Sequence, residues 1–237
     1  MNPVIDEHAK SRLIRRFGHD VTTWIDALPD LVATLTARWG LTPVEHVPGG
    51  TGATFLCTTA VLKVTPDHDV AALEARALTA WAGTPAMVGL LDTDLARGAL
   101  LLERITPGSP ADEPARVLPQ LHDTANPAGF PPLGARVDFL FETLLTRRTG
   151  TYHATEHRLA RELAEDDVEP VLLHGDMHPA NVLQGPRGPV AIDPRAHAGD
   201  PAFDWMDFVH DGHDLHGADV DLDRVHDWLT AFAPFYG

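Results

Sequence analysis

The feature that most constrains this chain is a polar segment at residues 174–181 (HGDMHPAN), which lies between short apolar runs. Residues 171–173 (VLL) lead into it, and residues 189–192 (PVAI) follow it and end at Asp193. Short apolar runs bounded by turn residues indicate strands, so the polar side chains are expected at strand ends. Any fold for this chain must therefore accommodate a polar loop between short apolar strands.

The spacing of the polar residues suggests a chemistry. His174 is followed by Asp176, then by Asn181 and, twelve residues further on, by Asp193. This spacing is typical of kinase catalytic loops, in which the first Asp accepts a hydroxyl proton while the Asn and a later Asp hold metal ions. We therefore predict Asp176 as the catalytic base and Asn181 and Asp193 as ligands of Mg²⁺, which prefers oxygen ligands.

A lysine within an apolar strand gives a second signal. Residues 60–64 (AVLKV) are typical of a strand and contain Lys63, which must reach the surface or meet an anion. Glu74 follows eleven residues later in a predicted helix over 70–81. Taken alone, Glu74 is more simply a solvated residue, but a strand lysine paired with a helix glutamate is the nucleotide-binding arrangement of kinases. We therefore predict that Lys63 holds the phosphates of ATP and that Glu74 holds Lys63.

Two further stretches complete the predicted nucleotide site. Gly50, Thr51 and Gly52 join strands predicted at 44–47 and 54–59, and glycines let backbone N–H groups approach phosphate closely. The same turn can equally be an ordinary hairpin turn. After a strand at 99–102, the backbone from Glu103 to Ile105 is expected to face the adenine.

The distribution of periodic segments predicts an α+β fold in three parts, and the kinase-like motifs around Lys63 and Asp176 favour a protein-kinase-like, bilobal arrangement of them. Residues 1–40 are read as a helical segment, broken at Pro29 and ended by Gly40. Residues 41–105 are predicted to form a nucleotide-binding lobe with an antiparallel sheet and a helix. Residues 106–237 are predicted to form a mostly helical catalytic and substrate-binding lobe, with helices expected at 111–122, 135–148, 155–166, 201–209 and 224–235.

Composition excludes several classes of function. The chain has 18 Lys and Arg against 34 Asp and Glu, a formal net charge of −16, which disfavours nucleic-acid binding. Such acidity can concentrate a cationic small substrate, although it can equally serve only solubility. The single Cys57 permits no intrachain disulfide. No signal-peptide pattern or membrane-spanning apolar run is present, so a cytoplasmic protein is expected.

A rival interpretation makes His174, Asp176 and His178 the ligands of a transition metal in a hydrolase. On an extended loop, residues four apart do not share a face as they would on a helix. This interpretation also leaves Lys63 and Asn181 without a role.

The polar loop and its surroundings resemble the aminoglycoside phosphotransferase family of the protein-kinase-like fold, in particular its streptomycin 6-kinase and hydroxyurea phosphotransferase group. The resemblance covers roughly residues 10–235. It is carried by residues 172–183 (LLHGDMHPANVL), 191–195 (AIDPR) and 199–204 (GDPAFD), with support from 15–18 (RRFG), 60–64 and 98–104 (GALLLER).

The resemblance implies ATP-dependent phosphorylation of a hydroxyl on a small molecule, such as streptomycin or hydroxyurea, in antibiotic resistance. It also implies that Asp204 braces the catalytic loop. Asp193 is followed by Pro194–Arg195 rather than Phe-Gly, which argues against a protein substrate. Separately from the resemblance, the acids Asp200, Asp207, Asp211 and Asp214 follow Asp193, where a polycationic acceptor could meet them, although for any one of them a solvated surface position is the simpler interpretation.

Enzymes of this family are expected to continue into further C-terminal helices, whereas this sequence ends at Gly237. Three possibilities follow: an active monomer, a swapped dimer, or a nucleotide-binding protein of the same fold with little or no transferase activity.

Overall fold

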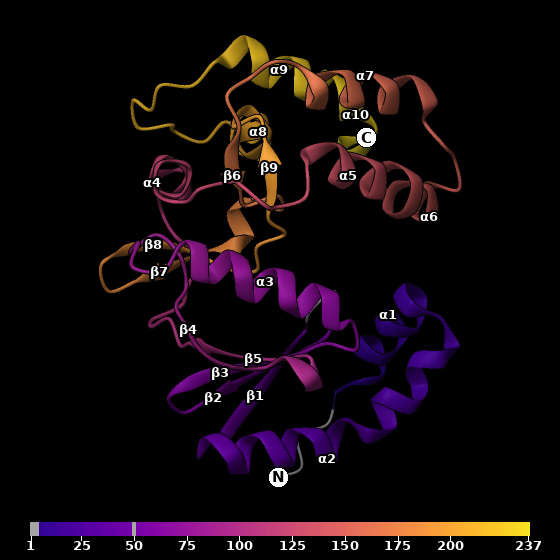
Figure 1. The fold of residues 1–237 in the computed structure, drawn as a ribbon, viewed down its shortest axis with the longest axis vertical. Coiled ribbons are helices and arrows are strands. Elements are labelled where there is room, and N and C mark those ends of the chain that lie inside the picture. Colours follow the sequence, from indigo (N-terminus) through magenta and orange to yellow (C-terminus); the bar gives the residue numbers. More distant parts are fainter. Residues whose placement is uncertain (1–4, 49–50) are drawn as a thin grey trace. The chain divides into compact units, whose positions relative to one another are not determined.

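The computed structural model describes residues 5–48 and 51–237, and the chain divides into two compact units (Figure 1). The first unit comprises the chain up to Thr79 together with Val88–Arg104. The second unit comprises Ala80–Met87 and Ile105–Gly237. The expected α+β class is confirmed, because an antiparallel sheet dominates the first unit and helices dominate the second.

The first unit is built on a five-stranded antiparallel sheet. Its strand order is β1-β2-β3-β5-β4, so each strand pairs with a neighbour close in sequence. The bounds of these strands are β1 (Pro43–Pro48), β2 (Ala53–Cys57), β3 (Ala60–Val64), β4 (Leu90–Asp94) and β5 (Ala99–Glu103). A short 3₁₀ turn, η2 (Leu95–Arg97), joins the last two.

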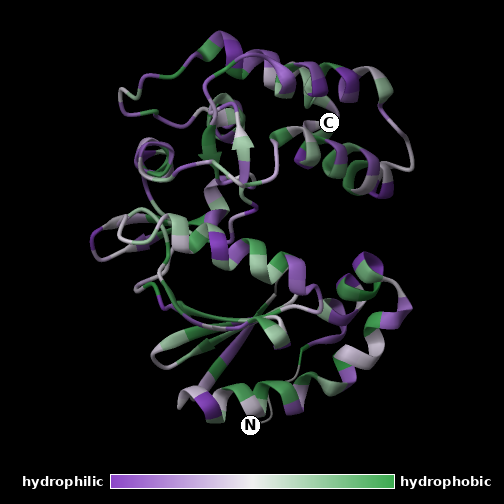
Figure 2. Ribbon diagram, in the orientation of Figure 1, coloured by the Kyte–Doolittle hydropathy of each residue, from purple (hydrophilic) through white to green (hydrophobic). Residues whose placement is uncertain are grey.

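Helices cover both faces of this sheet (Figure 1). One face packs against α1 (Glu7–Phe17) and α2 (Thr22–Trp39), which are joined by the turn η1 (His19–Val21), and the other lies against α3 (His68–Ala80). Leu13, Leu35, Phe55 and Leu62 belong to one fully buried cluster. Figure 2 shows hydrophobic residues along the strands, and alternating hydrophobic and hydrophilic stretches along α2. Because side chains alternate along a strand, Lys63 faces away from the cluster that holds Leu62.

The predicted break at Pro29 is wrong. Helix α2 runs through this proline from Thr22 to Trp39 and ends at Gly40, as predicted. Proline removes one helical N–H donor, but Leu28 and Val32 on either side are almost completely buried. Packing of the apolar face outweighs the missing hydrogen bond, because tertiary contacts supply most of the stability of helices in proteins.

The second unit is mostly helical. Its helices are η3 (Pro114–Arg116), α4 (Val117–Thr124), α5 (Leu133–Asp138), a π-helical segment η4 (Phe139–Leu145), α6 (Thr146–Thr149), α7 (Ala154–Glu165), η5 (Pro179–Asn181), α8 (Ala202–His210), α9 (Leu222–Ala231) and α10 (Ala233–Tyr236). Two small antiparallel pairs complete it: β6 (Val171–Leu173) with β9 (His197–Gly199), and β7 (Val182–Gly185) with β8 (Gly188–Ala191).

Two of the predicted helices in this unit are subdivided. The helix expected over 135–148 contains the π-helical segment, where the Thr146 hydroxyl donates to the Phe141 carbonyl five residues earlier. The helix expected over 224–235 is interrupted at Phe232, which separates α9 from α10. Neither interruption is visible in the apolar periodicity. Among the described residues, every helix falls short of the combined length and apolar character needed to cross a bilayer.

Candidate active site

Asp204 holds the start of the polar loop in place. Its carboxylate accepts hydrogen bonds from the backbone N–H groups of His174, at 2.7 Å, and Gly175, at 2.9 Å. Asp204 is 1% exposed. Burial acts to raise its pKa, but the hydrogen bond from His122 and the backbone donors outweigh burial and hold the pKa below its ordinary value. The bracing role that the resemblance implied for Asp204 agrees with these contacts.

Gly175 allows the loop to pass close to a second segment. Its φ is +75°, a conformation that side chains with a Cβ rarely adopt. A Cβ added here would lie 2.1 Å from the carbonyl oxygen of Arg195. The same segment is tied to the loop by a hydrogen bond from Arg195 N to the His174 carbonyl, at 2.7 Å. Only glycine fits this position without displacing the backbone.

His174 has a structural role in the loop. It is fully buried, and burial lowers its pKa, so the imidazole is neutral near pH 7. Its Nε2 lies 2.9 Å from the Ile192 carbonyl and donates to it. Three side chains that bind one metal ion bring their ligand atoms within about 4.8 Å of one another. Among the described residues, His174, Asp176 and His178 do not form such a group. The geometry therefore gives the metal-hydrolase interpretation no support.

The candidate metal ligands Asn181 and Asp193 lie on adjacent segments. Ile192 N donates to the Asn181 carbonyl at 2.9 Å, so the residue before Asp193 is bonded directly to Asn181. The Asn181 amide nitrogen donates to the Asp176 carbonyl at 2.8 Å, which orients the amide. Asp193 has a φ of +61°, which is uncommon for a residue with a side chain, although Asp adopts it more readily than most. Its side chain is 35% exposed and lies 3.1 Å from Arg195 Nη2.

Arg136 contacts the loop and was missed by the sequence analysis. From α5, its Nη2 lies 2.8 Å from Asp176 Oδ1, and its Nε donates to the Gly175 carbonyl at 2.8 Å. The arginine side chain is 9% exposed, whereas that of Asp176 is 38% exposed. Arg136 lies forty residues before Asp176 and belongs to no motif, so nothing in the sequence marked this contact.

A cavity of about 220 Å³ adjoins Asp176 within the second unit. Its polar lining includes Arg136, Arg148, Asp176, His178 and Asp207, and its apolar lining includes Leu140, Met177, Phe203, Met206, Phe232, Phe235 and Tyr236. Burial raises the pKa of the Asp207 carboxyl, which accepts a hydrogen bond from the Tyr236 hydroxyl at 2.5 Å. The cavity therefore combines an aromatic wall with a few charged groups, as small-molecule sites commonly do.

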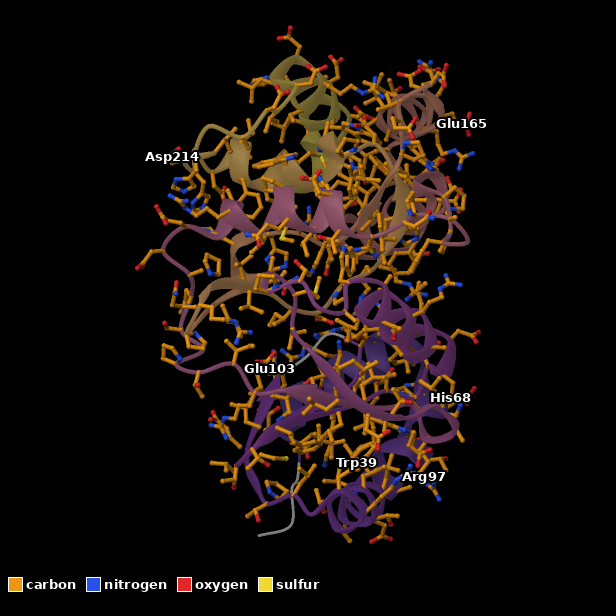
Figure 3. The ribbon with its side chains drawn as sticks, turned by 60° about the vertical axis from the view of Figure 1, so that its left-hand side comes forward. Trp39, His68, Arg97, Glu103, Glu165 and Asp214 are labelled. Atoms are coloured by element: carbon orange, nitrogen blue, oxygen red, sulfur yellow. The ribbon has the colours of Figure 1, made fainter. Side chains whose placement is uncertain are left out.

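The acids expected to meet a cationic acceptor have different environments. Asp200 is buried and accepts hydrogen bonds from Arg224 Nε, at 2.6 Å, and Trp228 Nε1, at 2.7 Å, so this prediction is wrong for Asp200. Asp211 and Asp214 are exposed, and Figure 3 shows Asp214 near the edge of the molecule. Of the four acids, Asp207 alone lines the described cavity.

In the first unit, Lys63 and Glu74 form the predicted pair. Lys63 Nζ lies 2.7 Å from both carboxylate oxygens of Glu74, and the two side chains are 11% and 2% exposed. A strand and a helix thus fix one ammonium group on the α3 side of the sheet. The pairing matches the sequence prediction, while contact with a nucleotide stays a prediction.

The remaining predicted nucleotide contacts are only partly described. Gly50 lies outside the described residues. Thr51 is buried, and its carbonyl accepts from the Thr65 hydroxyl at 2.7 Å. A Cβ on Gly52 would lie 2.1 Å from the Val64 carbonyl, so close strand packing already explains this glycine.

At the end of β5, the backbone N–H of Glu103 already donates to the Gly89 carbonyl at 2.8 Å. Its carboxylate accepts from Gly89 N at 3.2 Å. Glu103 is labelled in Figure 3, and Ile105 begins the second unit. Internal bonding therefore occupies the N–H of Glu103, while contact of Glu103 and Ile105 with adenine stays a prediction.

Solved structures share the fold of this chain. A choline kinase from Streptococcus pneumoniae matches 86% of this chain and 79% of its own, with a TM-score of 0.59 and 16% identity. A macrolide 2'-phosphotransferase from Brachybacterium faecium matches 86% of this chain and 82% of its own, with a TM-score of 0.51 and 20% identity. At these identities the comparison establishes the fold alone, a kinase-like α+β fold.

Sequence comparison establishes the family. The chain belongs to the aminoglycoside/hydroxyurea antibiotic resistance kinase family, which matches residues 38–234. It is 32% identical to streptomycin 6-kinase of Streptomyces glaucescens, over 86% of this chain and 76% of that protein. It is 34% identical to hydroxyurea phosphotransferase of Kitasatospora aureofaciens, over 80% of this chain and 63% of that protein. The family resemblance stated from the motifs is confirmed.

Proposed function

We propose that this protein transfers the γ-phosphoryl group of ATP to a hydroxyl of a small molecule, an aminoglycoside such as streptomycin or else hydroxyurea, and so confers resistance. The observation that carries the proposal is the environment of Asp176. Its carboxylate borders a cavity and is partly exposed, while Asp204 and Asn181 hold the backbone on either side of it. Membership of a family of resistance kinases supports the same chemistry.

The phosphates of the nucleotide are assigned to Lys63 in the first unit, and the acceptor is assigned to the cavity in the second. Lys63, held by Glu74, provides an ammonium group for the phosphates of ATP, with Thr51, Gly52 and the backbone at Glu103 and Ile105 as further contacts. A choline kinase of the same fold has been solved in complex with AMP, which supports a nucleotide site in this architecture.

Asn181 and Asp193 fit a magnesium site. They offer an amide oxygen and a carboxylate on adjacent segments, and Mg²⁺ prefers a small number of such oxygens together with phosphate oxygens. When bound, Mg²⁺ neutralises negative charge on the phosphates. Because Asn181 also donates to the Asp176 carbonyl, the candidate metal ligand and the candidate base are fixed in one loop.

Asp176 is assigned to the acceptor. Its carboxylate accepts the hydroxyl proton as the acceptor oxygen bonds to the γ-phosphorus, and the bond from that phosphorus to the bridging oxygen of ADP breaks. Positioning and charge neutralisation carry most of the rate in such reactions. The cavity beside Asp176 would receive the acceptor, and Asp207 is the carboxyl that a cationic acceptor would meet there.

The proposal places the reaction in the cytoplasm, where ATP is available, and applies equally to a monomer and to a swapped dimer. It includes neither a nucleic-acid nor a membrane partner. The competing possibility is a nucleotide-binding protein with little or no transferase activity.

The test is Asp176→Asn, assayed with ATP, Mg²⁺, streptomycin and hydroxyurea. Loss of a general base is expected to lower kcat by at least about 100-fold, while ATP still raises the melting temperature. Asp214→Asn is the matched control, because it removes the same charge from an exposed site outside the cavity. If the unaltered protein gains thermal stability from ATP but phosphorylates neither compound, the nucleotide-binding alternative replaces the proposal.

A further inference from the structure

We propose that Arg136 is a positioning residue that orients the carboxylate of Asp176 for proton transfer. This inference rests on the proposed function, in which Asp176 is the base. The side chain of an aspartate can adopt several χ1 rotamers, and its carboxylate turns freely over a broad range of χ2, unless a partner fixes it. Arg136 is that partner, because its Nη2 lies 2.8 Å from Asp176 Oδ1.

The guanidinium group contacts two consecutive residues of the loop. While Nη2 binds Asp176 Oδ1, Nε donates to the Gly175 carbonyl at 2.8 Å. Because the guanidinium is planar and rigid, these two bonds fix the carboxylate relative to the backbone that carries it. Among the described contacts, Oδ2 of Asp176 makes no hydrogen bond, so it remains available for the acceptor hydroxyl.

Arg136 itself is held firmly. Its neighbours on α5, Leu133 and Val137, are completely buried, and its guanidinium carbon lies 5.7 Å from the centre of the Phe139 ring. The arginine side chain is 9% exposed and that of its partner 38%. The buried cation is therefore the fixed member of the pair, and the exposed carboxylate is the member available to react.

The cavity shows why such a restraint is needed. His178 and Asp207 line the same cavity as Asp176, and the Asp176 carboxylate acts electrostatically on that of Asp207. Without Arg136, none of the described side-chain contacts would fix the Asp176 carboxylate in this cavity. Rotation of the carboxylate then removes it from the orientation that the bond to Oδ1 defines.

The test compares Arg136→Leu, Arg136→Lys and, as a matched control, Arg161→Leu. Arg161, on α7, forms an ion pair at 3.1 Å with Asp138, the last residue of α5. Arg161 contacts neither Asp176 nor the cavity among the described contacts. Initial rates are measured with streptomycin and hydroxyurea, and as ATP hydrolysis without acceptor, where water replaces the hydroxyl.

Arg136→Leu is expected to lower kcat by about 10- to 100-fold, by analogy with the loss when a residue that orients a metal ligand is removed. KM for ATP should stay within about threefold, because the loss falls on the chemical step. Arg136→Lys should be intermediate, since it keeps one donor without the fork. A fourth variant, Arg136→Ala, leaves room for a small cation, and added methylguanidinium should restore part of its kcat, an effect that a purely structural role would not produce.

The outcomes separate this inference from the proposed function. If the unaltered protein neither transfers phosphate nor hydrolyses ATP, or if Asp176→Asn keeps full activity, the proposed function fails and the inference with it. If Asp176→Asn is inactive while Arg136→Leu or, should that variant not fold, Arg136→Lys keeps the normal kcat, the inference alone is overturned. It is also overturned if kcat falls equally in Arg161→Leu, or if methylguanidinium restores nothing.

Discussion

The ion pairs Lys63–Glu74 and Arg136–Asp176 both join a cation to a carboxylate, but they differ in which side chain is the more exposed. In the first, both side chains are nearly buried, with the carboxylate at 2% exposure and the ammonium at 11%. In the second, the guanidinium is at 9% and the carboxylate at 38%. In the first pair, the buried Glu74 carboxylate holds the ammonium group of Lys63 in place. In the second pair, the buried Arg136 guanidinium holds the carboxylate of Asp176 in place.

This difference matters because burial decides what a charged pair contributes. Removing one partner of a buried pair leaves an uncompensated charge and is strongly destabilising, whereas solvent screens an exposed partner. The first pair is therefore expected to matter for the stability of its unit as well as for ATP. The second is expected to matter chiefly for catalysis.

The largest expected effect tests this contrast directly, with Glu74→Gln against Arg136→Gln. Glu74→Gln should lower the free energy of unfolding by about 3 kcal/mol or more, because Lys63 then remains charged and nearly buried. Arg136→Gln should cost about 1 kcal/mol or less, because the charge left behind, the Asp176 carboxylate, is 38% exposed and is screened by solvent. Urea unfolding of both variants provides the measurement. Equal losses would show that the two pairs do not differ in the way that burial indicates.

A second prediction concerns the backbone beneath the second pair. Gly175→Ala should cost about 2 to 3 kcal/mol, because a left-handed residue gains a Cβ that overlaps the Arg195 carbonyl. Gly129→Ala is the matched control, since Gly129 has a φ of +83° with nothing within 4 Å of an added Cβ, and should cost about 1 kcal/mol. Thermal unfolding and kcat are measured for both variants, and kcat should fall only in Gly175→Ala. If both variants lose similar amounts of stability and kcat, the close approach of Gly175 to the Arg195 carbonyl is not the reason for glycine at this position.

The smallest expected effect is a pH dependence near the second pair. Burial lowers the pKa of His197 to about 4, and its Nδ1 donates to the Arg195 carbonyl at 2.6 Å. Between pH 6.5 and 4 the unfolded chain binds a proton that the folded protein does not. The contribution of His197 to stability is therefore complete above pH 6.5 and is lost as the pH falls toward 4.

For this histidine we expect a loss of about 1 kcal/mol between pH 7 and pH 5.5, measured by urea unfolding at both values. His197→Asn keeps a donor for the Arg195 carbonyl but does not titrate, so it should show a smaller loss over the same interval. An unchanged pH dependence in His197→Asn would assign the effect to other groups, such as His174, whose pKa burial also lowers.

Much of the candidate site follows from local sequence, and the exceptions have a common origin. Lys63 and Glu74 are eleven residues apart on consecutive elements, so strand alternation and helix geometry bring them together. Asp176, Asn181 and Asp193 belong to one loop and the hairpin after it, so their spacing along the chain limits their separation in space. Asp200 was misjudged, because its partners Arg224 and Trp228 come from α9, more than twenty residues later.

The sequence by itself determined the α+β class, the family and the identity of the reactive loop, because these depend on periodicity and on residue types at short, regular spacings. Only the tertiary structure decided that α2 continues through Pro29, that Asp200 is buried, and that Arg136 holds Asp176. Each of these results depends on contacts between segments distant in sequence. Packing selects such contacts from many that the same local pattern would allow.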